Sequence, residues 1–171
     1  GRNMAGVKPG TIKKLLVLED LPKPGSKHGL HGYHGGYITL RRVLGTVPVE
    51  ADGSASFEVP ALRAVYFVAL DENGVAVKRM QNFTTVMPGE TQGCVGCHEP
   101  RTGNPDHRID SGGPMAMKRP PNRIAPVVGV PDVFDYPRDI QPIWDRHCVA
   151  CHNSAKPEGR VVLTGDNNEW F

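Results

Sequence analysis

Apolar and polar residues alternate in short segments over the first half of the chain, with turn residues between the segments. The apolar segments fall at 12–18 ("IKKLLVL"), 37–50, 54–60 ("SASFEVP"), 64–70 ("AVYFVAL"), 75–80 and 82–88. Runs of this length bounded by Gly, Pro, Asn and Asp are typical of β-strands. The dipeptides Asp52-Gly53 and Asn73-Gly74 predict tight turns between antiparallel strands. The pattern therefore predicts a mainly β fold, an antiparallel β-sandwich of Ig-like or transthyretin-like type, over residues 1–93.

The pattern changes after residue 93. Residues 100–137 contain eight prolines, which excludes long regular elements because proline lacks a backbone N–H and fixes its own φ angle. This stretch is expected to be either a free linker or a segment wrapped against a bound group. We therefore divide the chain into residues 1–93, residues 94–136 and residues 137–171.

The stretch "PRDIQPIWDRHCVACH" (137–152) predicts a helix. Its residues Ile140, Ile143, Trp144 and His147 follow the i, i+3, i+4, i+7 spacing of one helical face. Asp139 is expected to cap the helix, and Pro142 would fall in its first turn, where proline is tolerated. The third part of the chain is therefore expected to be loop-rich and partly α-helical.

All four cysteines lie in two C-x-x-C-H motifs, Cys94 to His98 and Cys148 to His152. This spacing is known from covalent c-type haem attachment, from zinc sites and from redox-active pairs. Haem attachment alone explains a histidine directly after the second cysteine, since that histidine binds the iron. Zinc binding by the four thiolates remains an alternative, although 50 residues lie between Cys97 and Cys148. We predict two c-type haems, with the residues Cys94, Cys97, His98, Cys148, Cys151 and His152 as attachment points and proximal iron ligands.

A glycine-rich loop carries His28, His31 and His34, which recur every three residues. Neutral imidazole is a strong ligand for haem iron, and glycine lets a backbone approach a flat surface closely. One of these histidines, His34 or His31 in preference to His28, is predicted to bind a haem on its distal side. The competing ligands are His107, His147, Met115 and Met117. A mobile polar loop with no ligand role is the alternative.

Composition and charge narrow the choice of partners. The formal charge of +2 is too small to predict nucleic-acid binding, and no apolar run is long enough to span a membrane. No signal peptide is visible. Because c-type haem is attached outside the cytoplasm, we expect an extracytoplasmic location, in the periplasm or an equivalent compartment. The chain is then expected to be a mature or excised piece, with a truncated second haem domain.

The stretch "RDIQPIWDRHCVACHN" (138–153) resembles the opening of cytochrome c domains found in planctomycete-type multihaem proteins. The stretches "LGTVPVEADGSASFEVPA" (44–61), "VYFVALDENGVAVKRMQNFT" (65–84) and "MPGETQGCVGCHEPR" (87–101) resemble the hydrazine synthase alpha subunit middle domain. This resemblance implies a β-sandwich-like domain with one haem, followed by a second haem segment. It also implies that the six cysteine and histidine residues of the two motifs bind haem.

The chain departs from the hydrazine synthase pattern at one position. The resemblance implies that in hydrazine synthase proper a tyrosine four residues after the first motif histidine binds iron, and that the histidine turns to zinc. This chain has Thr102 there, so His98 is expected to bind iron in the ordinary way. We therefore predict a dihaem module that relays electrons to a redox partner protein or to further haem domains. The alternatives are a haem enzyme with an open iron site for a small nitrogen or oxygen species, and a zinc-binding or structural module.

Overall fold

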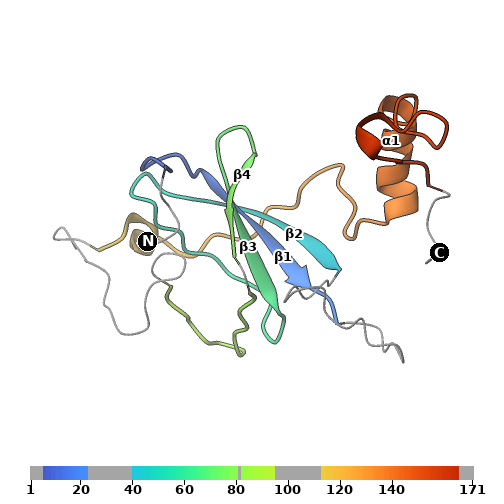
Figure 1. Cartoon of the computed structure of the whole chain (residues 1–171). Helices are drawn as coiled ribbons and strands as arrows, with labels where there is room; N and C mark the ends of the chain where they lie inside the picture. The colour runs from blue at the N-terminus through green and yellow to red at the C-terminus, as the bar shows by residue number, and fades with distance from the viewer. Residues whose placement is uncertain (1–5, 23–39, 81, 95–112, 166–171) are drawn as a thin grey trace. The chain divides into compact units, whose positions relative to one another are not determined.

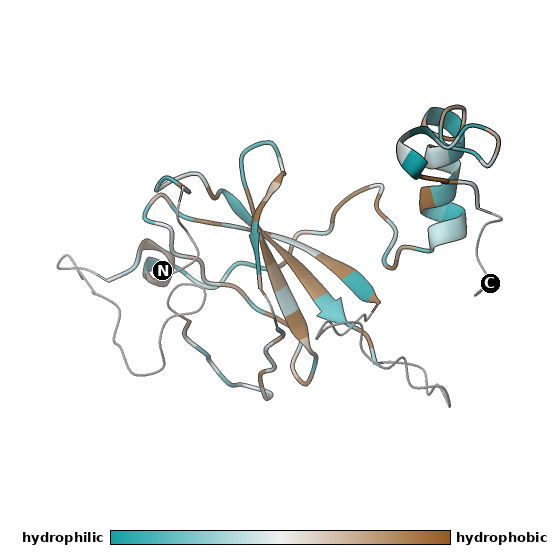
Figure 2. Cartoon of the chain, viewed as in Figure 1, coloured by the Kyte–Doolittle hydropathy of each residue, from teal (hydrophilic) through white to brown (hydrophobic). Residues whose placement is uncertain are grey.

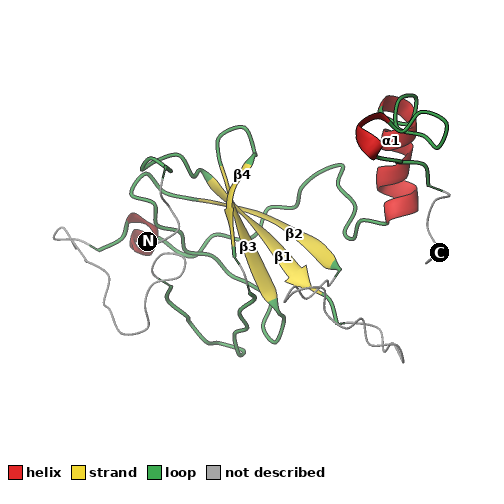
Figure 3. Ribbon diagram, in the orientation of Figure 1, coloured by secondary structure: helices red, strands yellow, loops and turns green. Residues whose placement is uncertain are grey.

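The computed structural model describes residues 6–22, 40–80, 82–94 and 113–165 (Figure 1). The chain divides into two compact units, Gly1–Asp132 and Val133–Phe171. The described strands all lie in the first unit and the α-helix lies in the second (Figure 3).

The first unit is built on one four-stranded sheet. Its strands are β1 (Lys14–Asp20), β2 (Arg41–Pro48), β3 (Val65–Leu70) and β4 (Ala76–Arg79). They lie in the order β2-β1-β3-β4, and every neighbouring pair is antiparallel. The prediction of a mainly β, antiparallel fold is confirmed. The strands of the described residues make one sheet, so the second layer of a sandwich stays a prediction.

The core of the first unit gathers on the two central strands and β2. Val17, Val47, Val65 and Tyr66 are its least exposed side chains. Val17 in β1 lies opposite Gly45 of β2 and Phe67 of β3. Apolar residues are frequent along the strands (Figure 2). Burial of these side chains is the main stabilising term of the sheet.

A charged residue is buried at one end of the sheet. Glu19 is 4% exposed, and its two carboxylate oxygens pair with Arg42 at 3.2 Å and Arg63 at 2.8 Å. A carboxylate at this depth requires such partners, because an unpaired buried charge costs several kcal/mol. The alternating pattern of β1 gave no sign that this position is buried.

Residues 113–132, which we call the return segment, lie against the sheet within the first unit. Ala125 exchanges two backbone hydrogen bonds with Thr46 of β2, at 2.8 and 2.9 Å, and the Asp132 carbonyl accepts one from Val43 at 2.7 Å. The return segment therefore covers the free edge of β2, which is otherwise open to pairing with another chain. The free-linker interpretation is wrong for these residues.

Two of the predicted strands shorten to single bridges. In the segment 54–60 only Phe57 forms one, with Asn122 of the return segment, and in the segment 82–88 only Thr84 does, with Val65. Proline explains why the pairing stops, since Pro60, Pro88 and the prolines before Asn122 have no N–H to give to a neighbouring strand.

The second unit contains a π-helical turn and two short helices. The elements are η2 (Tyr136–Ile140), α1 (Gln141–His147) and η3 (Glu158–Arg160). Pro142 lies in the first turn of α1 as predicted. An α-helix that included residue 138 would need a backbone N–H at residue 142 to donate to the Arg138 carbonyl, and proline has none. The predicted extension of the helix to residue 152 is wrong, because the backbone leaves helical geometry at Cys148. No helix in the described ranges is long and apolar enough to cross a membrane.

The predicted cap also needs correction. The residue that caps η2 is Asp135, whose side chain accepts a hydrogen bond from the Arg138 amide at 3.0 Å. Asp139 lies inside η2, and its carboxylate accepts the Asp135 amide at 2.7 Å. The Arg138 guanidinium and this amide hold the pKa of Asp139 down at about 2. Each of the two aspartate side chains thus accepts a hydrogen bond from a backbone amide of this turn, similar to a capping box.

Candidate functional site

The second C-x-x-C-H motif forms a turn directly after α1. The Cys148 carbonyl accepts hydrogen bonds from the amides of Cys151 and His152, at 3.1 and 3.0 Å. Cys148 is half-buried, Cys151 is exposed, and both thiols are free. The turn therefore leaves both thiols available for covalent chemistry.

Asn153 holds the loop that follows the motif. Its side-chain amide donates to the Val149 carbonyl at 2.9 Å, and its side-chain oxygen accepts the amides of Ala155 and Lys156 at 3.0 and 2.9 Å. The loop then returns to the motif, where the Glu158 amide donates to the Cys151 carbonyl at 3.2 Å. One short polar side chain thus closes the backbone around the cysteine pair, as asparagine commonly does in turns.

His152 is half-buried, and its Nδ1 atom is buried without a hydrogen-bond partner among the described residues. Its backbone is fixed instead. The His152 carbonyl accepts the Leu163 amide at 2.9 Å, and the residue forms a bridge with Pro157. A buried imidazole nitrogen without a partner is costly, and neutral imidazole is the commonest protein ligand for metals. The position is suited to a ligand-binding histidine.

Gln141 connects the two ends of the second unit. It is 8% exposed, and its side-chain oxygen accepts the Tyr136 hydroxyl at 2.7 Å. Its side-chain nitrogen donates to the Asp145 carboxylate at 2.7 Å and to the Leu163 carbonyl at 2.9 Å. Because Leu163 also bonds to His152, Gln141 fixes the backbone behind the motif. The sequence pattern does not indicate this role, since a glutamine in an amphipathic helix is normally solvent-exposed.

Replacing Gln141 by leucine is expected to lower the free energy of unfolding of the second unit by about 2 kcal/mol. The substitution leaves the Tyr136 hydroxyl and the Leu163 carbonyl without their partner. Urea unfolding followed by tryptophan fluorescence measures it. Arg146→Leu on the exposed side of the same helix is the control, with a change below about 0.5 kcal/mol. Equal effects of the two substitutions would show that the hydrogen bonds of Gln141 do not stabilise this unit.

The remaining predicted site residues divide into those that the structure describes and those outside its described ranges. Cys94 is exposed at the end of a described range. His147 is exposed in the last turn of α1, and Met115 and Met117 of η1 (Met115–Lys118) are 43% and 70% exposed. The residues outside the described ranges are Cys97, His98, His28, His31, His34 and His107. Within the described ranges, no three His, Cys, Asp or Glu side chains gather into a metal site.

The fold and the motif define a mainly β protein with paired-cysteine motifs, the second of them in a small helical unit. Residues 10–99 match the model of the family described as hydrazine synthase alpha subunit middle domain. The match covers more than half of the chain, which therefore belongs to this family.

A solved structure shares the fold. Kuenenia stuttgartiensis hydrazine synthase superposes with a TM-score of 0.64 at 20% identity, over 93% of this chain. The chain spans 27% of the length of that protein. Comparison with curated proteins gave no match.

Proposed function

We propose that this chain is a dihaem c-type cytochrome module that relays electrons within a larger extracytoplasmic redox protein. The observation that carries the proposal is the use of all four cysteines in two C-x-x-C-H motifs. In the motif that the structure describes, both thiols are free and the histidine backbone is fixed from two sides. The partners are a redox protein or further haem domains.

The residues of the second motif fit a covalently attached haem. Cys148 and Cys151 would form the two thioether bonds, and His152 would bind the iron. The fixed backbone of His152, whose carbonyl accepts the Leu163 amide at 2.9 Å, supports this role. Cys94, Cys97 and His98 would hold the first haem in the same way. The bound haem supplies an iron that cycles between the ferrous and ferric states.

Exposed apolar side chains of the second unit support the same assignment. Ile143 in α1 is 54% exposed and Val161 is 44% exposed, although the unit is small. A haem covers apolar surface and adds apolar bulk to a small domain. On this proposal, residues 137–171 are the start of a cytochrome c domain, residues 94–136 carry the first haem, and residues 1–93 form a sandwich domain with a His-rich loop.

The distal ligands are part of the proposal. We assign one of them to the loop of His28, His31 and His34, with His34 or His31 preferred. Of the competitors, Met115 and Met117 lie in η1 with exposed side chains, and His147 is exposed in α1. Met80 is a weaker choice, since its sulfur accepts the Phe67 amide at 3.3 Å.

A second candidate function is catalysis at an open iron site, on a small nitrogen or oxygen species. Membership of a family named after hydrazine synthase favours it. Thr102, at the position where hydrazine synthase proper is expected to have an iron-binding tyrosine, argues against it.

The test is a spectrum of the full chain made with a c-type maturation system. An electron relay is expected to show two low-spin ferric haems in electron paramagnetic resonance. Both should be reduced by a chemical donor and reoxidised by an acceptor protein. A stable five-coordinate, high-spin ferric haem that turns over hydroxylamine, nitric oxide or peroxide would instead establish the enzyme.

A further inference from the structure

Leu163 joins the second C-x-x-C-H motif to the start of α1 through both of its backbone groups. Its amide donates to the His152 carbonyl at 2.9 Å, and its carbonyl accepts the side-chain nitrogen of Gln141 at 2.9 Å. Leu163 is half-buried, so these bonds are partly protected from competing water. The side chain of Gln141 is therefore linked to the motif histidine through a single residue.

The amide of Gln141 is oriented by two further partners. The Tyr136 hydroxyl donates to its oxygen at 2.7 Å, and the Asp145 carboxylate accepts from its nitrogen at 2.7 Å. An amide oxygen can only accept and an amide nitrogen can only donate, so a donor on one side and an acceptor on the other fix which end lies where. The second N–H of the same nitrogen is then directed at the Leu163 carbonyl.

Close contact holds the same side chain against the chain after Leu163. A Cβ atom added at Gly165 would lie 3.0 Å from Cγ and 3.1 Å from Cδ of Gln141. The backbone at residue 165 thus lies directly on the side chain of Gln141, and a larger residue there would have to displace it. Residues 163–165 are attached to Gln141 by a hydrogen bond and by packing.

We infer that Gln141 is a positioning residue for the second haem and that it acts on the iron ligand His152 through Leu163. This inference rests on the proposed function. The direction of an imidazole ring depends on where its backbone lies, and the bond from Leu163 fixes the His152 carbonyl. Groups behind the ligands of a metal hold them in place and tune the metal. Among the described residues of the second unit, Gln141 is the one polar residue that is buried.

The experiment compares Gln141→Met with Ile140→Ala in the full chain. Methionine is unbranched like glutamine, and it lacks the amide. Ile140→Ala removes apolar contacts of a half-buried neighbour and leaves the bond to Leu163 in place, so it reports on a general loss of stability. Both substitutions are made together with Cys94→Ser and Cys97→Ser, so that only the second haem is read.

Gln141→Met is expected to broaden the ferric signal of this haem in electron paramagnetic resonance. A less firmly held His152 ring takes a wider range of orientations on the iron. The midpoint potential is expected to shift too, since the axial ligand sets it. Ile140→Ala should change neither. Tyr136→Phe removes only the donor to the Gln141 oxygen. It should broaden the signal less, and it keeps the test usable if Gln141→Met does not fold.

Hydrogen exchange followed by mass spectrometry reads the connection independently of haem. Exchange in a peptide that spans Leu163 is expected to be about tenfold faster in Gln141→Met, because the carbonyl of this residue loses its partner and the segment opens more often. The increase should be larger than in Ile140→Ala, which keeps that partner.

The two measurements separate the outcomes. Faster exchange with an unchanged signal and potential would overturn the positioning role and leave Gln141 a purely structural contact. Equal spectral changes in Gln141→Met and Ile140→Ala would also overturn it, since the haem would then report only on the stability of the unit. Unchanged exchange would overturn the connection itself. If the protein with Gln141 intact carries no haem at the second motif, the proposed function fails, and exchange alone still tests the connection.

Discussion

Replacing Cys148 and Cys151 together by serine is expected to remove one of two haems and to leave the other attached at the first motif. Thioether bonds need the two thiols, and both are free in the turn after α1. Without them only coordination by His152 would hold a haem, and denaturation breaks coordination but not thioethers. Intact mass under denaturing conditions and a pyridine haemochrome assay measure the change from two haems to one.

The matched variant is Cys94→Ser with Cys97→Ser, which is expected to leave one haem at the second motif. Ser154→Ala is the control, since this residue is exposed two positions after His152 and should keep both haems. A wild-type protein with the mass of the bare polypeptide and with bound zinc would contradict the assignment. So would a second-motif variant that still carries two haems.

The strands of the sheet were predictable because their apolar segments are short and end at strong turn signals. Gly53 and Gly74 take positive φ angles of 84° and 77°, which the turns at Asp52-Gly53 and Asn73-Gly74 require. The order β2-β1-β3-β4 was not predictable. The central position of β1 depends on its pairing with both β2 and β3, and no periodicity in one segment reports on a partner distant in sequence.

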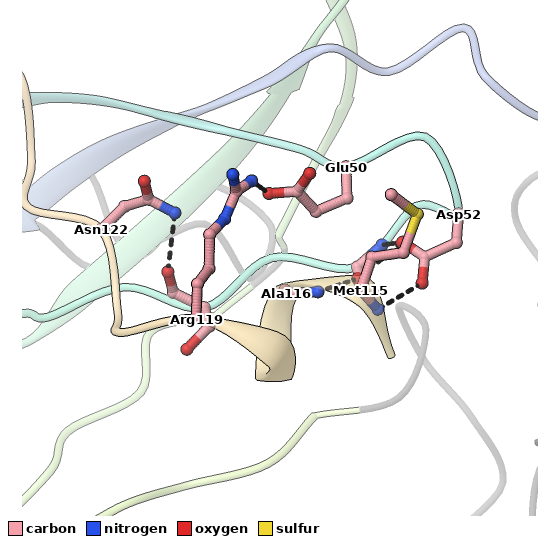
Figure 4. Close-up of polar contacts among 8 residues, drawn as sticks. Glu50, Asp52, Met115, Ala116, Arg119 and Asn122 are labelled. Atoms are coloured by element: carbon pink, nitrogen blue, oxygen red, sulfur yellow. Dashed lines mark hydrogen bonds and ion pairs between the residues drawn. The ribbon is translucent and has the colours of Figure 1, made fainter. Parts of the chain in front are cut away.

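The return segment shows a second limit of sequence patterns. It is attached through irregular backbone, single bridges and side chains such as Asp52 and Ser54, which accept the amides of Met115 and Ala116 (Figure 4). None of these features recurs at a regular spacing in the sequence. For residues 113–137, the part of this stretch that the structure describes, proline correctly predicted the lack of long elements. It could not separate a linker from a segment bound to a sheet edge, since both satisfy the same φ restriction.

In the helix of the second unit, the polarity of a side chain does not predict whether it is buried. The spacing of Ile140, Ile143, Trp144 and His147 predicted one apolar face, yet Ile143 is 54% exposed and His147 is exposed. Gln141 is buried instead, because three hydrogen bonds compensate the loss of water around its amide. Such compensation depends on groups at residues 136 and 163, which lie outside the helix.

The cysteine motifs were identifiable from the sequence because the residue types carry the chemistry. A C-x-x-C-H motif needs only local backbone to bring its own thiols and histidine together. A distal ligand is different, since it comes from elsewhere in the chain and its identity depends on tertiary structure. The choice among His34, His31 and the other ligands therefore stays a prediction.

Replacing Gly45 by alanine is expected to lower the free energy of unfolding of the first unit by about 3 kcal/mol, since strain and overpacking each cost about 1–3 kcal/mol. Gly45 has a φ of +141°, which L-residues rarely adopt. A Cβ atom there would lie 2.2 Å from the Ala125 carbonyl oxygen and 2.6 Å from a methyl group of Ile124. The return segment must then move away from β2 and lose its two hydrogen bonds with Thr46.

Urea unfolding of the full chain, followed by far-ultraviolet circular dichroism of the sheet, measures this loss. Gly74→Ala is the matched control, because its φ is +77° and no atom lies within 4 Å of an added Cβ. It should cost only the conformational strain, about 1 kcal/mol. Trypsin cleavage after Arg123 should also be faster in Gly45→Ala than in Gly74→Ala. Equal losses of stability and equal cleavage rates would mean that contact with the return segment does not stabilise the edge of β2, and that Gly45 serves the backbone conformation alone.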